Sequence, residues 1–167
     1  SYGDAVSGLL DERASRILAR DRRAVLLLIG AGSDRFRRSL VDRHPELASR
    51  VHATAFVEPA ALGNHIAACD LFVQPYPDGI SSRRTSATAC LSHGKPVVTT
   101  RGHLTESLWH GQDAVALADV DDADGFVTAA LRLIADEHGR KRLGANALRL
   151  YAHTFALSRV VATLKAA

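Results

Sequence analysis

The chain has 167 residues, of which 47% are apolar and 23% are charged, and its formal net charge is +3. This length suits one domain with a proper core, and this composition is typical of a globular protein rather than a disordered one. Acidic and basic residues are mixed, and no apolar run approaches the ~20 residues that span a bilayer, so we expect neither a nucleic-acid surface nor a transmembrane segment. No signal segment opens the chain, so we expect a cytoplasmic protein.

The chain begins at Ser1 and contains no methionine. We interpret it as a single domain, residues 1–167, taken from a longer protein whose partner domain is missing.

The two cysteines, Cys69 and Cys90, stand beside small apolar residues and lack the CxxC spacing of a metal or redox site. We therefore expect two buried free thiols. Eight histidines are scattered without metal-ligand spacing. The sequence thus predicts no metal site and no cofactor.

The first predicted elements are a helix, a strand and a second helix. Residues 4–18 carry apolar side chains at helical spacing. Residues 24–29 form a continuous apolar run, which is typical of a strand covered on both faces. A glycine turn, Gly30-Ala31-Gly32, then leads into a helix with Phe36 on its apolar face.

This glycine turn contains two of the three glycines of a GxGxxG dinucleotide fingerprint, because Phe36 stands near the place of the third. We favour a tight strand-to-helix turn, with Gly32 close enough to touch a ligand, over an NAD site.

A strand over residues 51–56 and a helix from Pro59 follow, and the next buried strand spans residues 70–74. It leads into the stretch that organises the chain, LFVQPYPDGISSRRTSATACLSHGKPVVTT at residues 71–100. Pro75, Pro77 and Gly79 prevent an early helix start, so we expect the helix to begin between residues 82 and 85.

Arg83 and Arg84 then lie where a helix presents free N–H groups and the positive end of its dipole. This position predicts phosphate binding, and a solvated helix end or an ion pair is the alternative. Thr85 and Ser86 can cap the helix or donate to phosphate. Asp78 is either a turn residue or a partner of sugar hydroxyls.

The remaining predicted elements are a strand over residues 95–99, a short helical stretch over 106–109, a weak strand over 114–118 and two helices. Residues 119–124 form an acidic turn that lacks the spacing of a calcium loop. The alternation of strands and helices predicts an α/β fold, with a parallel sheet between two layers of helices. Ligands bind such sheets at the carboxyl ends of the strands, where the loop after Tyr76 is richest in binding groups.

Three segments carry a family resemblance: LLLIGAGSD, VHATAFVEPAAL and, above all, ACDLFVQPYPDGISSRRTSATACLSHGKPVVTT. Together with ESLWHGQDAVAL and FALSRVVATL, they resemble the C-terminal half of retaining GT-B glycosyltransferases, over residues 24–164. The HGKPVV turn is the most specific element of the resemblance.

The resemblance implies a Rossmann-like domain that forms one half of a GT-B fold and binds a nucleotide sugar. It implies a C-terminal fragment of a two-domain enzyme, with base and ribose near the loop after Phe56 and diphosphate at glycine turns and basic side chains. Such a half would transfer no sugar alone, because the acceptor lies on the absent N-terminal domain. The expected binding residues are Gly32, Val57, Asp78, Gly79, Ile80, Ser81, Ser82, Arg83, Arg84, Thr85, Ser86 and Glu106.

The sequence departs from the family at two positions. Commoner members carry two glutamates eight positions apart, where this chain has Ser81 and Ala89. A noncatalytic nucleotide-binding or scaffold domain is therefore the alternative to a donor-binding half of an enzyme.

Overall fold

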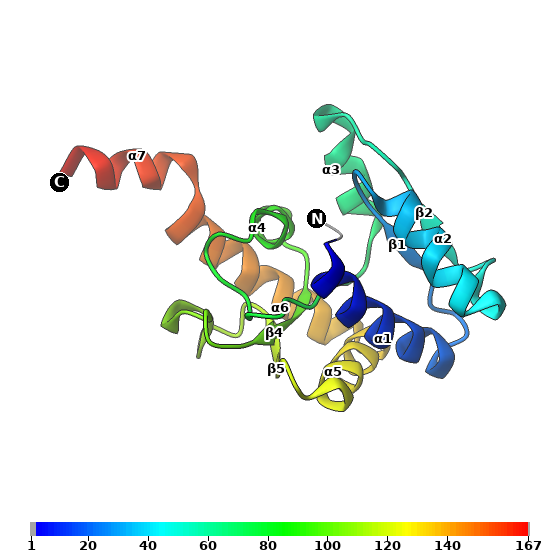
Figure 1. The fold of residues 1–167 in the computed structure, drawn as a ribbon. Coiled ribbons are helices and arrows are strands. Elements are labelled where there is room, and N and C mark those ends of the chain that lie inside the picture. The colour runs from blue at the N-terminus through cyan, green and yellow to red at the C-terminus, as the bar shows by residue number, and fades with distance from the viewer. Residues whose placement is uncertain (1–2, 167) are drawn as a thin grey trace.

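The computed structural model describes residues 3–166, which form helices around two short sheets (Figure 1). The α-helices are α1 (Asp4–Arg20), α2 (Ser33–Arg43), α3 (Pro59–Ala68), α4 (Thr85–Ser92), α5 (Ala123–Ala135), α6 (Glu137–Leu150) and α7 (Leu157–Ala166). The strands are β1 (Leu26–Leu28), β2 (Val51–Ala53), β3 (Phe72–Gln74), β4 (Val97–Arg101) and β5 (Ala116–Asp119). Short helical turns are η1 (Pro45–Leu47), η2 (Ser107–Trp109) and the π-helix η3 (Tyr151–Phe155).

All strand pairs are parallel, which confirms the predicted α/β fold. β1 pairs with β2, and Leu26 lies opposite Val51. β4 lies between β3 and β5. The prediction of a single sheet differs from the structure, which has two sheets. Within residues 3–166, no strand pairing joins β1 to β3.

The larger sheet, β3–β4–β5, is covered by helices on both faces. Val97 of β4 packs in a core with α4 and α6, and Val98 packs on the opposite face with α1 and α5. Successive side chains of a strand point to opposite faces, so two adjacent valines serve two cores. The smaller sheet packs against α1 and α2 through Leu28 and Phe36. Helix α1 therefore contributes to the cores of both sheets and joins them.

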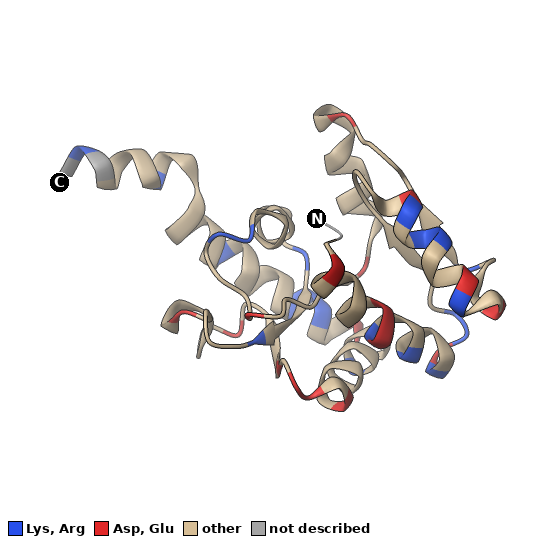
Figure 2. Ribbon diagram, viewed as in Figure 1, with Lys and Arg blue, Asp and Glu red and all other residues tan. Residues whose placement is uncertain are grey.

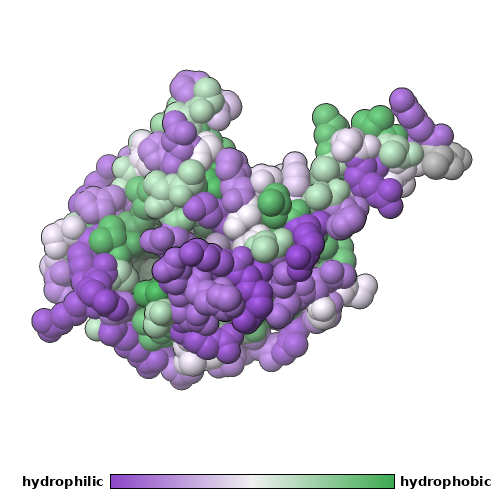
Figure 3. All heavy atoms as spheres, turned by 180° about the vertical axis from the view of Figure 1, so that it is seen from behind, coloured by the Kyte–Doolittle hydropathy of each residue, from purple (hydrophilic) through white to green (hydrophobic). Residues whose placement is uncertain are grey.

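A cavity of about 900 Å³ lies between the two sheets. Both β1 and β3 line it, together with apolar side chains of α1 such as Leu10 and Ala14. Figure 3 shows apolar surface around this hollow, seen from behind. Because the chain runs from β1 outward to β2 and then crosses back to β3, the cavity lies at the switch in strand order, where ligands bind in such folds.

Arg13 of α1 is buried to 1% exposure. Its Nη2 donates to the Val120 carbonyl at 2.6 Å, and its guanidinium lies 5.4 Å from the centroid of the Phe126 ring. A buried cation requires such partners. Arg13 therefore fixes α1 against the segment between β5 and α5.

All five predicted strands are present, with shifted ends. β2 stops at Ala53 rather than at residue 56, because Ala55 has a positive φ of 55° that interrupts extended backbone. β4 continues beyond the prediction to Arg101, which pairs with Asp119 of β5. Within residues 3–166, no helix combines the length and apolar content that a membrane span requires.

Candidate functional site

The segment between β3 and α4, residues 75–84, is called the central loop. It follows the carboxyl end of β3 and lies beside the end of β4. Gly79 has a φ of +87°, and a Cβ at this residue would overlap Thr105 Oγ1 and the backbone of Gly102. Only glycine fits this close approach between two loops.

Thr100 of β4 anchors the backbone of the central loop. Its hydroxyl accepts from Tyr76 N–H at 2.7 Å and donates to the Tyr76 carbonyl at 2.6 Å. The Thr100 carbonyl also accepts from Ile80 N–H at 2.8 Å, and the Asp78 carbonyl accepts from Leu104 N–H at 2.9 Å. These bonds hold the first half of the loop in a single arrangement.

The two adjacent arginines have different surroundings. Arg84 is half-buried, with its guanidinium 4.5 Å from the centroid of the Tyr76 ring and its Nη2 3.5 Å from Asp78 Oδ2. Arg83 is exposed and forms no ion pair within the described part of the chain. The pKa of Glu106 is lowered mainly by the Ser82 hydroxyl, and the nearby charge of Arg83 adds to this effect. Arg83 is thus the more available of the two for an incoming anion.

Tyr76 contacts both the Arg84 guanidinium and the start of α4. Its hydroxyl lies 2.9 Å from both Gln74 Oε1 and Ser86 Oγ. Burial raises the pKa of the Tyr76 phenol, so the ring stays neutral beneath the Arg84 guanidinium. Tyr76 and Ser86 also line the cavity between the sheets, so the central loop borders the switch in strand order.

Glu106 lies on the loop after β4 and reaches across to the central loop. Its Oε2 accepts from Ser82 N–H at 2.7 Å, and its Oε1 accepts from Ser82 Oγ at 2.6 Å. The Trp109 indole N–H also donates to Oε2, at 3.1 Å. The bond from the Ser82 hydroxyl is the main reason that the pKa of Glu106 is lowered.

Helix α4 begins at Thr85, within the predicted window, but its start differs from the prediction. Arg84 occupies the N-cap position, and no side chain caps the helix. The expectation that Thr85 or Ser86 provides the cap is therefore wrong. Ser86 binds the Tyr76 hydroxyl instead.

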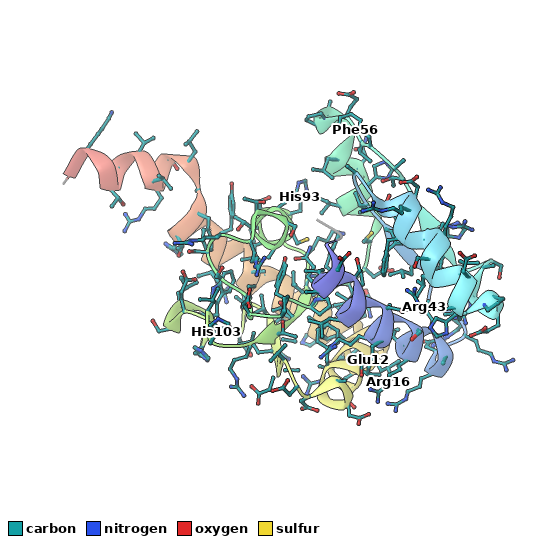
Figure 4. All side chains as sticks on the ribbon, viewed as in Figure 1. Glu12, Arg16, Arg43, Phe56, His93 and His103 are labelled. Atoms are coloured by element: carbon teal, nitrogen blue, oxygen red, sulfur yellow. The ribbon has the colours of Figure 1, made fainter. Side chains whose placement is uncertain are left out.

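The structure brings residues 78–86 and Glu106 together, but Gly32 and Val57 belong to the other part of the molecule. Gly32, with a φ of 85°, precedes α2, and Val57 follows β2. These two loops bind each other through Gly30 N–H to Thr54 Oγ1 at 3.0 Å. Figure 4 labels Phe56 on the β2–α3 loop, where 68% of its surface is exposed.

Three residues of the site were not predicted: Tyr76, Thr100 and Trp109. A tyrosine between two prolines and a threonine near the end of a strand are unremarkable in sequence. Trp109 offers a signal, since it is the only tryptophan and follows Glu106 at a spacing of three residues. These three residues contact the backbone of the central loop, the Arg84 side chain or the Glu106 carboxylate.

Basic residues are also concentrated on α2 (Figure 2). Arg37 Nε donates to the Val51 carbonyl at 2.6 Å, and Arg43 Nε pairs with Asp11 at 2.7 Å. Arg37 and Arg43 thus bind groups of the protein itself.

The cysteines are free, as predicted, although only Cys90 is buried and Cys69 is half-buried. Among the described residues, no group of three or more His, Cys, Asp or Glu side chains is arranged to hold a metal ion.

A family model described as glycosyl transferases group 1 matches residues 2–136. No match was found among curated proteins. Among solved structures, the chain is similar to the C-terminal domain of the glycosyl transferase group 1 family protein LpcC from Francisella tularensis. The TM-score is 0.75 at 15% identity, over 93% of this chain and 83% of that one.

Two longer proteins are similar as well. Sucrose-phosphate synthase from Thermosynechococcus elongatus gives a TM-score of 0.79 at 19% identity, over 98% of this chain and 42% of that one. HepE from Anabaena, in complex with UDP and glucose, gives 0.72 at 18% identity, over 93% and 44%. The chain thus spans less than half the length of these two proteins.

The structural similarities establish an α/β domain of the kind found as the C-terminal half of GT-B glycosyltransferases. The family model covers most of the 167 residues, so the chain belongs to the glycosyl transferases group 1 family.

Proposed function

We propose that this chain is the donor-binding half of a glycosyltransferase that moves a sugar from a nucleoside diphosphate sugar to an acceptor. The observation that carries the proposal is the central loop, where Arg83 is exposed and Arg84 is oriented by Tyr76 and Asp78. Guanidinium groups beside a helix start favour the phosphates of such a donor.

The proposed site extends from the central loop to the loops after β1 and β2. The diphosphate contacts Arg83 or Arg84 and the start of α4, and the nucleoside lies toward the loop that contains Val57. The structure of HepE with UDP and glucose supports a nucleotide sugar as the ligand class. The proposed binding residues are Gly32, Val57 and residues 78–86, and Glu106 belongs to the site through its bonds to Ser82.

The reaction would require a nucleoside diphosphate to leave from the sugar. Negative charge then develops on the phosphate, and a guanidinium already directed at it stabilises the transition state. Arg84 is suited to this role because its partners hold it in place before the ligand arrives.

A second candidate is a noncatalytic domain that binds nucleotides or serves as a scaffold. It is favoured by one observation, which is that Ser81 and Ala89 stand where commoner members of the family carry glutamates. Ligand binding without turnover in the full-length protein would support this alternative.

Thermal unfolding with UDP, GDP and ADP, and with their sugars, tests the proposal. A ligand at ~100 times its dissociation constant adds about 2.7 kcal/mol to the free energy of unfolding, so the correct nucleotide should raise Tm clearly. The absence of any shift with the whole panel would contradict the proposal.

Calorimetry on Arg83→Ala and Arg84→Ala locates the anion site. One charge-assisted bond contributes about 1.5 to 3 kcal/mol, so at least one variant should bind the diphosphate roughly tenfold to a hundredfold more weakly. Arg38→Ala, at an exposed arginine of α2 that pairs with Asp34, is the matched control. If both loop variants bind like the parent, the site lies elsewhere.

We further propose that the 167-residue chain alone does not transfer sugar. The similar proteins HepE and sucrose-phosphate synthase are more than twice as long as the region matched. A cleft that is open to water weakens every electrostatic contribution to catalysis. Product formation by the purified chain, measured with a labelled donor, would refute this.

A further inference from the structure

Under the proposed function, a Glu106 carboxylate that faced the ligand would repel a diphosphate. Like charges in contact disfavour binding. In the structure both oxygens of this carboxylate already accept hydrogen bonds, two from Ser82 and one from the Trp109 indole. Glu106 is therefore occupied by the protein rather than directed at a ligand.

Ser82 is the residue of the central loop that depends most on this contact. Thr100 holds Tyr76 and Ile80, and Asp78 and the Tyr76 ring hold the Arg84 side chain. Within residues 3–166, the hydrogen bonds that fix the Ser82 N–H and hydroxyl both go to Glu106.

The next residue after Ser82 is Arg83, which is exposed and has no ion pair among the described residues. A long side chain with few partners takes its direction from its backbone. We infer that Glu106 is a positioning residue, which holds the backbone at Ser82 so that the Arg83 guanidinium faces the diphosphate. This inference rests on the proposed function.

Two substitutions separate positioning from charge. Glu106→Asp keeps the negative charge but shortens the side chain, so it cannot reach Ser82 in the same way. Glu106→Gln keeps the length but places an amide N–H₂ against the Ser82 donors. If Glu106 acts by position, both variants should bind UDP more weakly, by roughly tenfold, because an Arg83 bond is impaired.

A role of Glu106 through its charge alone predicts different affinities for UDP. If Glu106 acts only through its charge, Glu106→Gln should bind UDP more tightly and Glu106→Asp should bind like the parent, and either outcome overturns the inference. Uridine, followed by chemical-shift changes, should bind equally to all variants because it carries no phosphate. Glu137→Gln, which removes an exposed carboxylate paired with Lys141 on α6, is the matched control.

Limited digestion with trypsin gives a readout that needs no ligand. Trypsin cleaves after arginine, and Arg83 and Arg84 lie in the loop that Glu106 holds. Glu106→Gln and Ser82→Ala should each be cut there roughly tenfold faster than the parent, since cleavage follows local opening.

These two readouts distinguish the possible failures. If the parent binds none of the nucleotides, the proposed function fails, and trypsin cleavage still decides whether Glu106 holds the loop. If cleavage at Arg83 and Arg84 is unchanged in both variants, the positioning role is refuted whatever the affinity for UDP.

Discussion

The central loop and the glycine turn after β1 are built on the same plan but differ in how firmly they are held. Each follows a parallel strand, each contains a glycine with positive φ, and each has a backbone N–H that donates to a threonine hydroxyl. Gly79 is enclosed by Gly102 and Thr105, whereas a Cβ at Gly30 would meet nothing within 4 Å.

The closer contacts of Gly79 indicate that the central loop is more rigid than the glycine turn after β1. A loop that is fixed from several sides can hold charged groups ready for a ligand, and such preorganisation strengthens electrostatic recognition. The glycine turn requires only a change of chain direction. The firmly held loop is also the one that carries Arg83 and Arg84.

Replacing the two glycines by alanine should produce the largest contrast. Gly79→Ala adds overpacking to the strain of a positive φ and should lower the free energy of unfolding by about 3 to 5 kcal/mol. Gly30→Ala adds strain alone, about 1 to 2 kcal/mol. Denaturant unfolding measures both. Equal losses would mean that the contact of Gly79 with Gly102 is unimportant.

The two threonines allow a smaller contrast. Thr100→Val leaves the N–H of Tyr76 unpaired in a buried region and removes one of the two donors to its carbonyl, which keeps the Gly79 N–H, so we expect a loss of about 1 to 3 kcal/mol. Thr54→Val removes the acceptor of Gly30 N–H, but Thr54 is only half-buried and water can replace it, so the loss should stay below about 1 kcal/mol. A reversed order in denaturant unfolding would contradict the comparison.

Acid should loosen the central loop at Glu106. Its pKa is lowered from 4.5, mainly by the Ser82 hydroxyl, so its bonds are fully present above pH 4.5 and are lost as the pH falls through the lowered value. Arg83, Arg84 and Asp78 are the other charged groups of this loop, and exposed His103 lies beside Asp78.

Fluorescence of Trp109, the only tryptophan, reports this change directly. Emission should be constant from pH 8 to about 5 and should change below 4.5 in the parent. The same change in Glu106→Gln would assign it to another group.

The smallest expected effect concerns the two thiols. Burial raises the pKa of Cys90 to about 12, so about one molecule in ten thousand carries its thiolate at pH 8. Cys69 is half-buried at the edge of the cavity, and its pKa is raised as well, mainly by burial. Iodoacetamide should modify Cys69 before Cys90, as peptide mass analysis can show. Equal rates would indicate that α4 opens readily.

The sequence was sufficient to predict the local elements of this fold but not how the strands assemble. The continuous apolar run at residues 24–29 and the prolines before Gly79 gave the correct strand and the start of α4, because those signals act on neighbouring residues. The division between β1 and β3 depends on how α1 packs across both sheets, and no local pattern encodes that.

In the candidate site, too, local features were predicted from the sequence and contacts between distant residues were not. Arg83 and Arg84 were predicted as site residues from their place before a helix, but the partners of Arg84 come from residues on either side of a turn. Glu106 was predicted to contact the donor, whereas the structure gives its carboxylate to Ser82, 24 residues earlier in the chain. A contact of this kind depends on how two loops run in three dimensions, which local sequence patterns do not specify.

The buried contact of Arg13 with Val120 has a consequence for the order in which the chain acquires structure. The two residues are 107 positions apart, so α1 can pack early against the smaller sheet, but the side that carries Arg13 and Ile17 finds its partners only after most of the chain has left the ribosome. Contacts between such distant residues are slow to form, and an amphipathic helix without its core exposes apolar surface meanwhile. During synthesis, this side of α1 should therefore be a binding segment for chaperones until α5 emerges.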